Sequence, residues 1–244
     1  MNKKKSKIVF TGGSGRFGNV LQKIDSNYKI LFPSKKILDI TNYSKSESYI
    51  KRIKPKYLIH AAAISRPMDL HEKNILKSID TNIIGTCNIV KICSKYKIKL
   101  IYFSTNYVYP KKSGSYSEKD PLLPWNAYAW SKLGGESAVQ MYKGSLILRV
   151  SMTEKPFLHK KAFANMNVNF MFHEKLAEVL FKLLDLRGIL NIGGKVQSVY
   201  NFAKLNNPNI IKEFVKKKNQ HKFPLNSTMN ISKFKEIFKG KLIR

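Results

Sequence analysis

The chain has 244 residues, 43% of them hydrophobic and 11% aromatic, so it can bury a core and is not intrinsically disordered. The length fits one large domain, or a main domain with a small appendage. No apolar run approaches the roughly 18 residues that span a bilayer. The basic first residues lead directly into a strand-like segment and not into the apolar stretch of a signal peptide. We therefore expect a cytoplasmic protein with no membrane partner.

The net charge of +30 arises from 45 basic and 15 acidic residues. Basic proteins gain affinity for nucleic acids by neutralising phosphates. Specific readers of nucleic acid rely on arginine for bidentate contacts, but only six of the basic residues here are arginine. The lysines are spread along the whole chain, which is typical of a codon bias. We expect no specific nucleic-acid partner, with sequence-independent binding of polyanions as the alternative, and the charge would favour a negatively charged substrate.

The two cysteines, Cys87 and Cys93, lie six residues apart in a segment with helical periodicity. A rise of about 1.5 Å per residue separates them by about 9 Å along the helix axis, which is beyond the reach of a disulfide. The sequence has no Cys-x-x-Cys motif and no cluster of cysteines and histidines. We therefore expect neither a disulfide framework nor a metal site.

Strand-like apolar runs alternate with segments of helical periodicity through the first 150 residues. Strands are predicted over residues 7–11, 28–32, 57–63, 99–104 and 145–150, and helices over residues 16–25, 41–54, 72–95 and 127–141. This alternation is typical of a doubly wound parallel sheet. After residue 150 the alternation weakens. Residues 155–169 have an irregular pattern, and a helix over 173–186 precedes a strand over 188–192.

Three glycines, Gly12, Gly15 and Gly18, follow the first strand and open the first helix. Glycine at 12 permits a sharp turn, glycine at 15 lets the backbone approach a pyrophosphate, and glycine at 18 lets the helix pack closely on the sheet. The helix start then offers free N–H groups to the phosphates. A glycine-rich structural turn is the alternative, but the position between a first strand and a first helix favours a dinucleotide site.

These features predict an α/β protein with a Rossmann-type, doubly wound parallel sheet. We expect residues 1–150 to form an NAD(P)-binding domain and residues 151–244 to form a small substrate-binding lobe. A fold that selects NAD usually carries an acidic residue after the second strand. Ser34 and Lys35, followed by a second lysine, stand there instead and suit a 2′-phosphate. We therefore expect NADP(H) in preference to NAD(H).

Tyr128 and Lys132 lie four residues apart near the start of a predicted helix, so their side chains share one face. A nearby cation favours the phenolate and makes Tyr128 a better proton donor and acceptor near neutral pH. Thr105 directly follows the fourth strand, at the sheet edge where such folds place their chemistry. Its hydroxyl could hold a substrate oxygen against Tyr128. A Tyr-x-x-x-Lys pair alone is common on surfaces, but here it accompanies the glycine loop.

At this point the chain resembles the extended short-chain dehydrogenase/reductase family, and within it the dTDP-4-dehydrorhamnose reductase branch. The matching segments are TGGSGRFG at 11–18, LDITN at 38–42, IKPKYLIHAAA at 53–63, TNIIGTCN at 81–88, IYFSTNYVYP at 101–110, YSEKDPLLPWNAYAWSKLGGE at 116–136 and LILRVS at 146–151. They follow the family's order through most of residues 7–151. Weaker similarity continues in GILNIGG at 188–194 and PLNSTMNISKF at 224–234.

The resemblance implies a set of cofactor-binding residues. Those at the pyrophosphate would be Gly12, Gly15, Arg16, Phe17 and Gly18; those beside the adenine would be Asp39 and Ile40; and those along the cofactor's ribose side would be Ala61, Ala62 and Ala63. It also implies a catalytic triad of Thr105, Tyr128 and Lys132. In that triad, Tyr128 protonates a 4-keto oxygen as hydride arrives from the nicotinamide, and Lys132 binds the nicotinamide ribose.

The chain departs from the family where a sugar should sit. Asn106 replaces a carboxylate of the family with an amide, residues 151–156 replace an aromatic residue and a glycine, and the second lobe is shorter. Ser65 and Arg66 follow the third strand and could reach a substrate diphosphate, although Arg66 could equally be a solvated surface residue. Trp125 could line the pocket or pack on the helix. We treat Ser65, Arg66, Asn106 and Trp125 as candidate substrate-binding residues.

Together these observations favour an NADP(H)-dependent reductase of a nucleotide-activated 4-keto sugar, as used in the biosynthesis of dTDP-rhamnose and polysaccharides. A sugar-nucleotide epimerase or dehydratase of the same family is the nearest alternative. A non-catalytic NADP-binding regulatory subunit is the alternative from another class. The expected partner is the nucleotide-sugar substrate, and we consider a homodimer as the oligomeric state.

Overall fold

The structure is a computed structural model that describes residues 5–238, without the side chains of residues 221 and 222. It divides into two compact units. The first takes in the chain as far as Ser104, together with Asn126–Leu148 and Ala177–Ile189; the second takes in Thr105–Trp125, Arg149–Leu176 and the chain from Leu190 onward. The expected division at residue 150 into a cofactor domain and a substrate lobe stays a prediction, and its outer ends, residues 1–4 and 239–244, lie outside the described residues.

A six-stranded sheet has the order β10-β5-β4-β3-β1-β2. Its strands are β1 (Lys7–Thr11), β2 (Lys29–Leu31), β3 (Tyr57–His60), β4 (Lys99–Thr105), β5 (Ser145–Val150) and β10 (Gly188–Ile192). The β1 strand pairs in parallel with β2 and β3, and β3 pairs in parallel with β4. The chain therefore extends the sheet outward from β1 in both directions. The predicted doubly wound, Rossmann-type α/β fold is confirmed.

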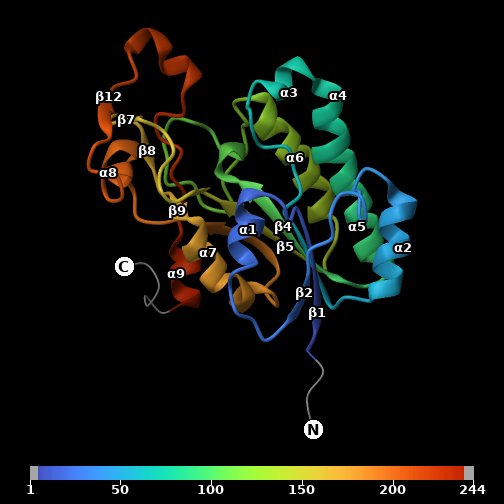
Figure 1. Ribbon diagram of the computed structural model, residues 1–244. Helices are drawn as coiled ribbons and strands as arrows, with labels where there is room; N and C mark the ends of the chain where they lie inside the picture. The colour runs from blue at the N-terminus through green and yellow to red at the C-terminus, as the bar shows by residue number, and fades with distance from the viewer. Residues whose placement is uncertain (1–4, 239–244) are drawn as a thin grey trace. The chain divides into compact units, whose positions relative to one another are not determined.

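Both faces of this sheet are covered by helices. Figure 1 shows α2 (Tyr43–Ile53), α5 (Gly85–Lys95) and α6 (Ala127–Gln140) over one face, and α1 (Arg16–Leu21) over the other. The buried cluster on the first face joins Val9, Leu58, Leu100 and Ile147 of the strands to Ile50, Ile89 and Val139 of the helices. Successive strand residues point to opposite faces, so Phe10 packs instead against Phe17 of α1, with ring centres 6.2 Å apart.

The single helix predicted over residues 72–95 is wrong. The chain instead forms α3 (Leu70–Lys73), α4 (Ile75–Ser78), the π-helix η1 (Ile79–Ile84) and α5. Asn74 breaks the helix because its backbone leaves the helical region (φ −141°, ψ 74°) while its side chain accepts a hydrogen bond from Lys77 N. An Asn that caps a new helix in this way competes with continuation of the old one. The apolar periodicity on both sides hides this break.

The second unit is built from short pieces. Its strands pair as β6 (Met152–Thr153) with β9 (Met171–Phe172), β8 (Asn167–Val168) with β11 (Gln197–Ser198), and β7 (Lys161–Phe163) with β12 (Ile211–Glu213). The irregular segment expected over residues 155–169 therefore contains two short strands. Later elements are α7 (His173–Leu180), η3 (Phe181–Leu183), α8 (Val199–Lys204), η4 (Lys217–Lys222) and α9 (Ser232–Ile237). A separate apolar cluster includes Val168, Phe202 and Ile210.

Between residues 5 and 238, no helix has the length and apolar character needed to cross a membrane. Cys87 and Cys93 are both free thiols.

Candidate active site

The turn between β1 and α1 can be formed only with glycine at two of its positions. Gly12 has φ +84°, and a Cβ there would lie 2.8 Å from the backbone nitrogen of Ala62. A Cβ at Gly18 would lie 2.4 Å from the carbonyl oxygen of Gly13. Gly15 donates its N–H to the carbonyl oxygen of Gly12 at 2.9 Å. The result is a tight turn, the glycine cradle, in which the backbone of the three glycines is uncovered by their own side chains, which fits the approach of a pyrophosphate.

Arg16 and Phe17, both expected at the pyrophosphate, differ in where their side chains lie. The Phe17 ring is buried, with its centre 5.1 Å from that of Phe103, so the side chain anchors α1 to the sheet. Any contact of Phe17 with a phosphate would come from its backbone. The exposed Arg16 side chain donates from Nη2 to Ser65 Oγ at 2.8 Å. Arg16 and Ser65 are therefore neighbours at the rim of the glycine cradle.

The segment after β2 presents the residues expected at the adenine end. Ser34 and Lys35 are exposed, and Lys35 Nζ lies 3.8 Å from Asp39 Oδ2. The other carboxylate oxygen of Asp39 accepts hydrogen bonds from the backbone nitrogen and the hydroxyl of Thr41, at 3.0 and 2.8 Å. Ile40 is buried, and its side chain packs against Gly85 at the start of α5. Hydrogen bonds between Thr41 and Asp39 thus hold the turn, while the Lys35 ammonium remains in solvent.

A buried histidine holds the third strand to its neighbours. His60 is 0% exposed, with Nδ1 2.8 Å from Thr11 Oγ1 and Nε2 3.0 Å from Thr86 Oγ1. Because Thr86 donates its hydroxyl proton to Asn82 O, it can only accept from His60, which places the imidazole proton on Nε2. Burial, together with the nearby Lys132 charge, lowers the pKa of His60 to about 3. The imidazole is therefore neutral.

The Thr11 hydroxyl extends this network to the expected ribose side of the cofactor. Thr11 Oγ1 accepts a hydrogen bond from Ala62 N at 3.3 Å, and Ala62 N is also the atom that a Cβ at Gly12 would meet at 2.8 Å. Ala61, Ala62 and Ala63 are all half-buried and continue directly from β3. The three alanines therefore lie beside the glycine cradle at the carboxyl ends of β1 and β3.

Helix α6 carries Tyr128 and Lys132 and begins at the capping residue Asn126, whose side chain accepts from Ala129 N at 2.7 Å. Lys132 is 3% exposed, and its ammonium lies 4.2 Å from the centre of the Tyr102 ring. Burial lowers the pKa of Lys132 to about 7, against the opposing effect of the Glu136 carboxylate. Tyr128 is half-buried, and its ring centre lies 5.2 Å from that of His71.

Asn82, which is not among the predicted site residues, connects the segment after β3 to the start of α6. It is 0% exposed, and its amide accepts from Ile64 N at 2.8 Å and donates to Ile64 O at 2.9 Å. The same amide donates to Ser131 Oγ at 2.8 Å, and Ser131 donates to the carbonyl oxygen of Tyr128. Asn82 lies in the π-helical turn, an irregularity that is frequent at functional sites. The signal in the sequence was the motif at 81–88.

Three of the expected site residues belong to the second unit. Thr105 ends β4, is buried, and accepts a hydrogen bond at Oγ1 from Tyr107 N at 3.2 Å. Asn106 uses its amide nitrogen to donate to the backbone and the hydroxyl of Ser227, at 3.1 and 3.2 Å. The Trp125 ring lies 4.9 Å from that of Tyr107, and its indole nitrogen is buried with no hydrogen-bond partner in the described residues. Their roles toward a substrate stay predictions.

Two further features bear on the remaining expectations. Arg66 is exposed, immediately after the half-buried Ser65. Within residues 5–238, no group of three or more His, Cys, Asp or Glu side chains could hold a metal ion.

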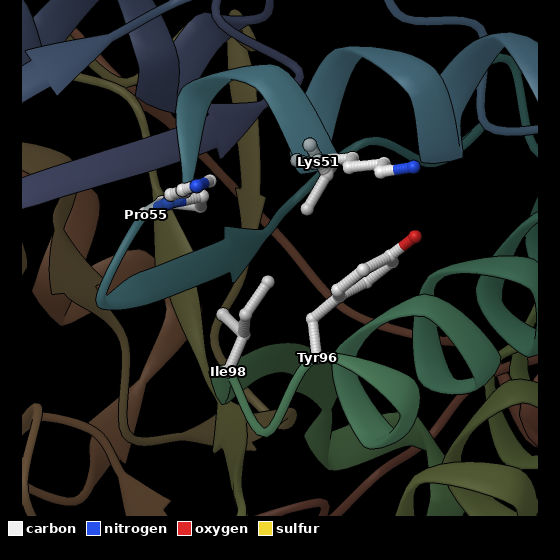
Figure 2. Close-up of a pocket in the computed structure, with 6 residues that line it drawn as sticks. Lys51, Pro55, Tyr96 and Ile98 are labelled. Carbon is white, nitrogen blue, oxygen red and sulfur yellow. The ribbon is translucent and has the colours of Figure 1, made fainter.

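A hollow of about 370 Å³ in the first unit is lined by none of the expected site residues. Figure 2 shows it between the ends of α2 and α5, where Lys51, Pro55, Tyr96 and Ile98 line it with Ile50 and Lys54. These helix ends lead into the amino ends of β3 and β4, whereas the glycine cradle follows Thr11 at the carboxyl end of β1. The hollow is therefore at the opposite edge of the sheet from the candidate site.

The parallel sheet, the glycine cradle and the Tyr128–Lys132 helix define a member of the extended short-chain dehydrogenases/reductases. Within that class the chain belongs to the RmlD family, since residues 6–179 match the family described as the RmlD substrate binding domain. The resemblance noted from the sequence motifs is confirmed.

Two curated relatives illustrate the range of proteins that the chain resembles. A dTDP-4-dehydrorhamnose reductase of Aggregatibacter actinomycetemcomitans is 30% identical over 200 residues, which cover 79% of this chain and 64% of that protein. Methionine adenosyltransferase 2 subunit beta of Xenopus laevis is 29% identical over 154 residues, covering 59% of this chain and 46% of that protein. The chain thus spans less than two thirds of the length of either relative.

Solved structures show the same fold. A dTDP-4-dehydrorhamnose reductase from Bacillus anthracis str. Ames in complex with NADP has a TM-score of 0.84 at 23% identity, covering 100% of this chain and 95% of that one. The Bordetella bronchiseptica enzyme WbmG in complex with NAD has a TM-score of 0.79 at 18% identity, covering 100% and 91%.

Proposed function

We propose that the protein is an NADP(H)-dependent reductase of a nucleotide-activated 4-keto sugar. The observation that carries the proposal is the pairing of Tyr128 with a buried Lys132 on the helix that follows β4, within a fold whose first turn is a glycine cradle. The relatives in sequence and structure include dTDP-4-dehydrorhamnose reductases. When bound, the cofactor supplies the hydride, while the protein orients the reactants and handles the proton.

The cradle formed by Gly12, Gly15 and Gly18 would hold the pyrophosphate, with Arg16 at its rim and Phe17 contributing backbone. At the other end, Asp39 and Ile40 would flank the adenine. Ser34 and Lys35 would bind a 2′-phosphate, because an exposed hydroxyl and an ammonium complement its charge and oxygen atoms. This is the basis for proposing NADP(H) rather than NAD(H). Ala61, Ala62 and Ala63 would line the ribose side.

In the proposed reaction, Tyr128 donates the proton that the sugar oxygen acquires. Lys132 would bind the nicotinamide ribose, and its charge would stabilise the phenolate that remains. The Thr105 hydroxyl would hydrogen-bond the sugar oxygen. Ser65, Arg66, Asn106 and Trp125 would contact the rest of the substrate, with Arg66 suited to a diphosphate.

The experiment that tests this proposal is NADPH consumption against a panel of dTDP-, UDP- and GDP-linked 4-keto sugars. We expect oxidation of NADPH with at least one member and a matching reduced sugar among the products. A protein that releases tightly held NAD(H) on denaturation and equilibrates sugar epimers without net NADPH consumption would instead be an epimerase of the same family.

A regulatory subunit is the second candidate, because the relative from Xenopus laevis is named as the beta subunit of methionine adenosyltransferase 2. In that case the chain would bind NADP(H) without turning over any sugar in the panel. Thr105, Tyr128 and Lys132 favour the enzyme, since a protein that only binds the cofactor has no need of a proton donor. Cofactor binding without turnover across the panel would favour the subunit.

A further inference from the structure

The proposed reaction leaves one buried polar group beside Tyr128 without a role. His71, in α3, is 1% exposed, and its ring is tilted by 56° to the Tyr128 ring. Figure 1 shows α3 beside the first turns of α6, and the two helices are in contact. Nδ1 of His71 lies 2.7 Å from Ser78 Oγ, whereas Nε2 is buried and has no hydrogen-bond partner in the part of the chain that the structure describes.

The contact with Ser78 fixes the tautomer of this imidazole. Ser78 is 4% exposed, so its hydroxyl proton needs an acceptor inside the protein. The acceptor available to it is Nδ1 of His71. A neutral imidazole that accepts at Nδ1 carries its proton on Nε2. Burial lowers the pKa of His71, so the ring is neutral at pH 7. His71 therefore holds a buried N–H donor next to the Tyr128 ring.

Packing alone does not explain why a hydrogen-bond donor is buried at this position. An unsatisfied buried N–H destabilises the fold, and a leucine would fill a similar volume without one. The face of an aromatic ring compensates an N–H only weakly. A phenolate oxygen is a much better acceptor, because hydrogen bonds to charged groups are the stronger ones. Tyr128 would carry such an oxygen once it has given its proton to the sugar.

We propose that His71 is a positioning residue for Tyr128: held by Ser78, its imidazole sets the orientation of the phenol ring, and its Nε2–H stabilises the Tyr128 oxygen after proton transfer. This rests on the proposed function, in which Tyr128 is the acid. The proton that reaches the sugar oxygen comes from Tyr128. His71 keeps its own proton throughout and acts only through a hydrogen bond.

The first test does not depend on catalysis. Long-range nitrogen–proton NMR correlations report the tautomer of each histidine, and the His71 signals are identified by their loss in His71→Gln or by cross-peaks to the Tyr128 ring. We expect a neutral ring with the proton on Nε2 at pH 7. A ring protonated on Nδ1, or on both nitrogens, would overturn the inference.

The second test compares two substitutions. His71→Gln keeps an N–H group near the position of Nε2, whereas His71→Leu fills the space without a donor. With the sugar that the panel identifies, we expect kcat of His71→Leu to fall about tenfold and kcat of His71→Gln to stay within about threefold of the wild type. The KM for NADPH should be unchanged in both variants. The thermal midpoint of His71→Leu should fall, because the buried Ser78 hydroxyl loses its acceptor, so kcat is compared well below that midpoint.

The outcomes separate this inference from the proposed function. Equal kcat values for the Leu variant and the wild type, with an active wild type, would remove the role of His71 and leave the reductase intact. A wild type that reduces no sugar would remove the reductase, and the NMR tautomer would still decide whether His71 presents a donor to Tyr128.

Discussion

The ammonium of Lys132 lies over the ring of Tyr102, 4.2 Å from its centre, in a site where the lysine is 3% exposed. The ring face replaces part of the hydration that the ammonium has lost. Burial nevertheless places the pKa of Lys132 at about 7, with Glu136 opposing the shift. The charge of Lys132, which lies four residues from Tyr128 on α6, therefore changes with pH around neutrality.

The first prediction concerns the pH dependence of turnover. In the wild type, kcat should fall as the pH rises through about 7, because Lys132 then loses the charge that would stabilise the Tyr128 phenolate. Lys132→Met has no titrating group at this position. We expect it to lose this inflection and to turn over about 10²–10³ times more slowly. Steady-state pH profiles of both proteins test this, and an unchanged inflection in the variant would contradict the assignment.

The second prediction concerns the glycine cradle. In Gly18→Ala the new Cβ would lie 2.4 Å from the carbonyl oxygen of Gly13, so the turn must shift. We expect the Kd for NADPH to rise at least about tenfold, with a stability loss of about 1–3 kcal/mol. Gly134→Ala is the matched control, since the three atoms nearest to its Cβ all belong to the Ile83 side chain, at 2.8, 3.0 and 3.6 Å, and none belongs to the backbone. Titration by cofactor fluorescence should show normal affinity in the control and weak binding in Gly18→Ala.

The third prediction concerns the choice between the two cofactors. Lys35 is exposed, with its ammonium 3.8 Å from Asp39. If it binds the 2′-phosphate, Lys35→Ala should weaken NADPH binding by about fivefold to tenfold and leave NADH binding unchanged. The neighbouring Lys36→Ala provides the control for lost positive charge. Equal losses in both variants would assign the effect to the overall charge of the protein instead of a specific contact.

The fourth prediction concerns stability in acid. Native His60 stays neutral down to about pH 3, whereas an unfolded histidine takes up a proton near 6.5. Between these values the unfolded state binds more protons, so the free energy of unfolding decreases as the pH falls from 6.5 toward 3. The contribution is at most about 1.4 kcal/mol per pH unit.

His60→Asn removes this proton uptake and should flatten the dependence over the same range. Denaturant titrations at several pH values measure both slopes. If the wild type and the variant lose stability in parallel between pH 6 and 4, other groups carry the effect.

Local sequence patterns predict the central part of this fold well. The apolar run at Lys7–Thr11 and the glycines after it identify β1 and the cradle, because a buried parallel strand and a φ of +84° at Gly12 each demand particular residue types. The placement of Tyr128 and Lys132 on one helix follows from the helical period alone. Both features are encoded within a few neighbouring residues.

Contacts between distant parts of the chain could not be predicted in this way. The π-helical turn directs Asn82 toward Ile64 and Ser131, and no periodic pattern marks that change of register. The break at Asn74 places His71 against Tyr128, although a continuous helix fits the apolar pattern equally well. The contacts of Asn82 are with residues far along the sequence, where local propensity carries no information. The cap at Asn74 is local, but what it brings together, His71 and Tyr128, is again distant in sequence.

The central claim is that Tyr128 supplies the proton in a reduction by NADPH, and Tyr128→Phe tests it most directly. The substitution removes the hydroxyl and keeps the ring that packs against His71. With the cognate 4-keto sugar, single-turnover oxidation of NADPH should be about 10²–10⁴ times slower than in the wild type, while the Kd for NADPH stays within about twofold. A variant that oxidises NADPH at the wild-type rate would contradict the account.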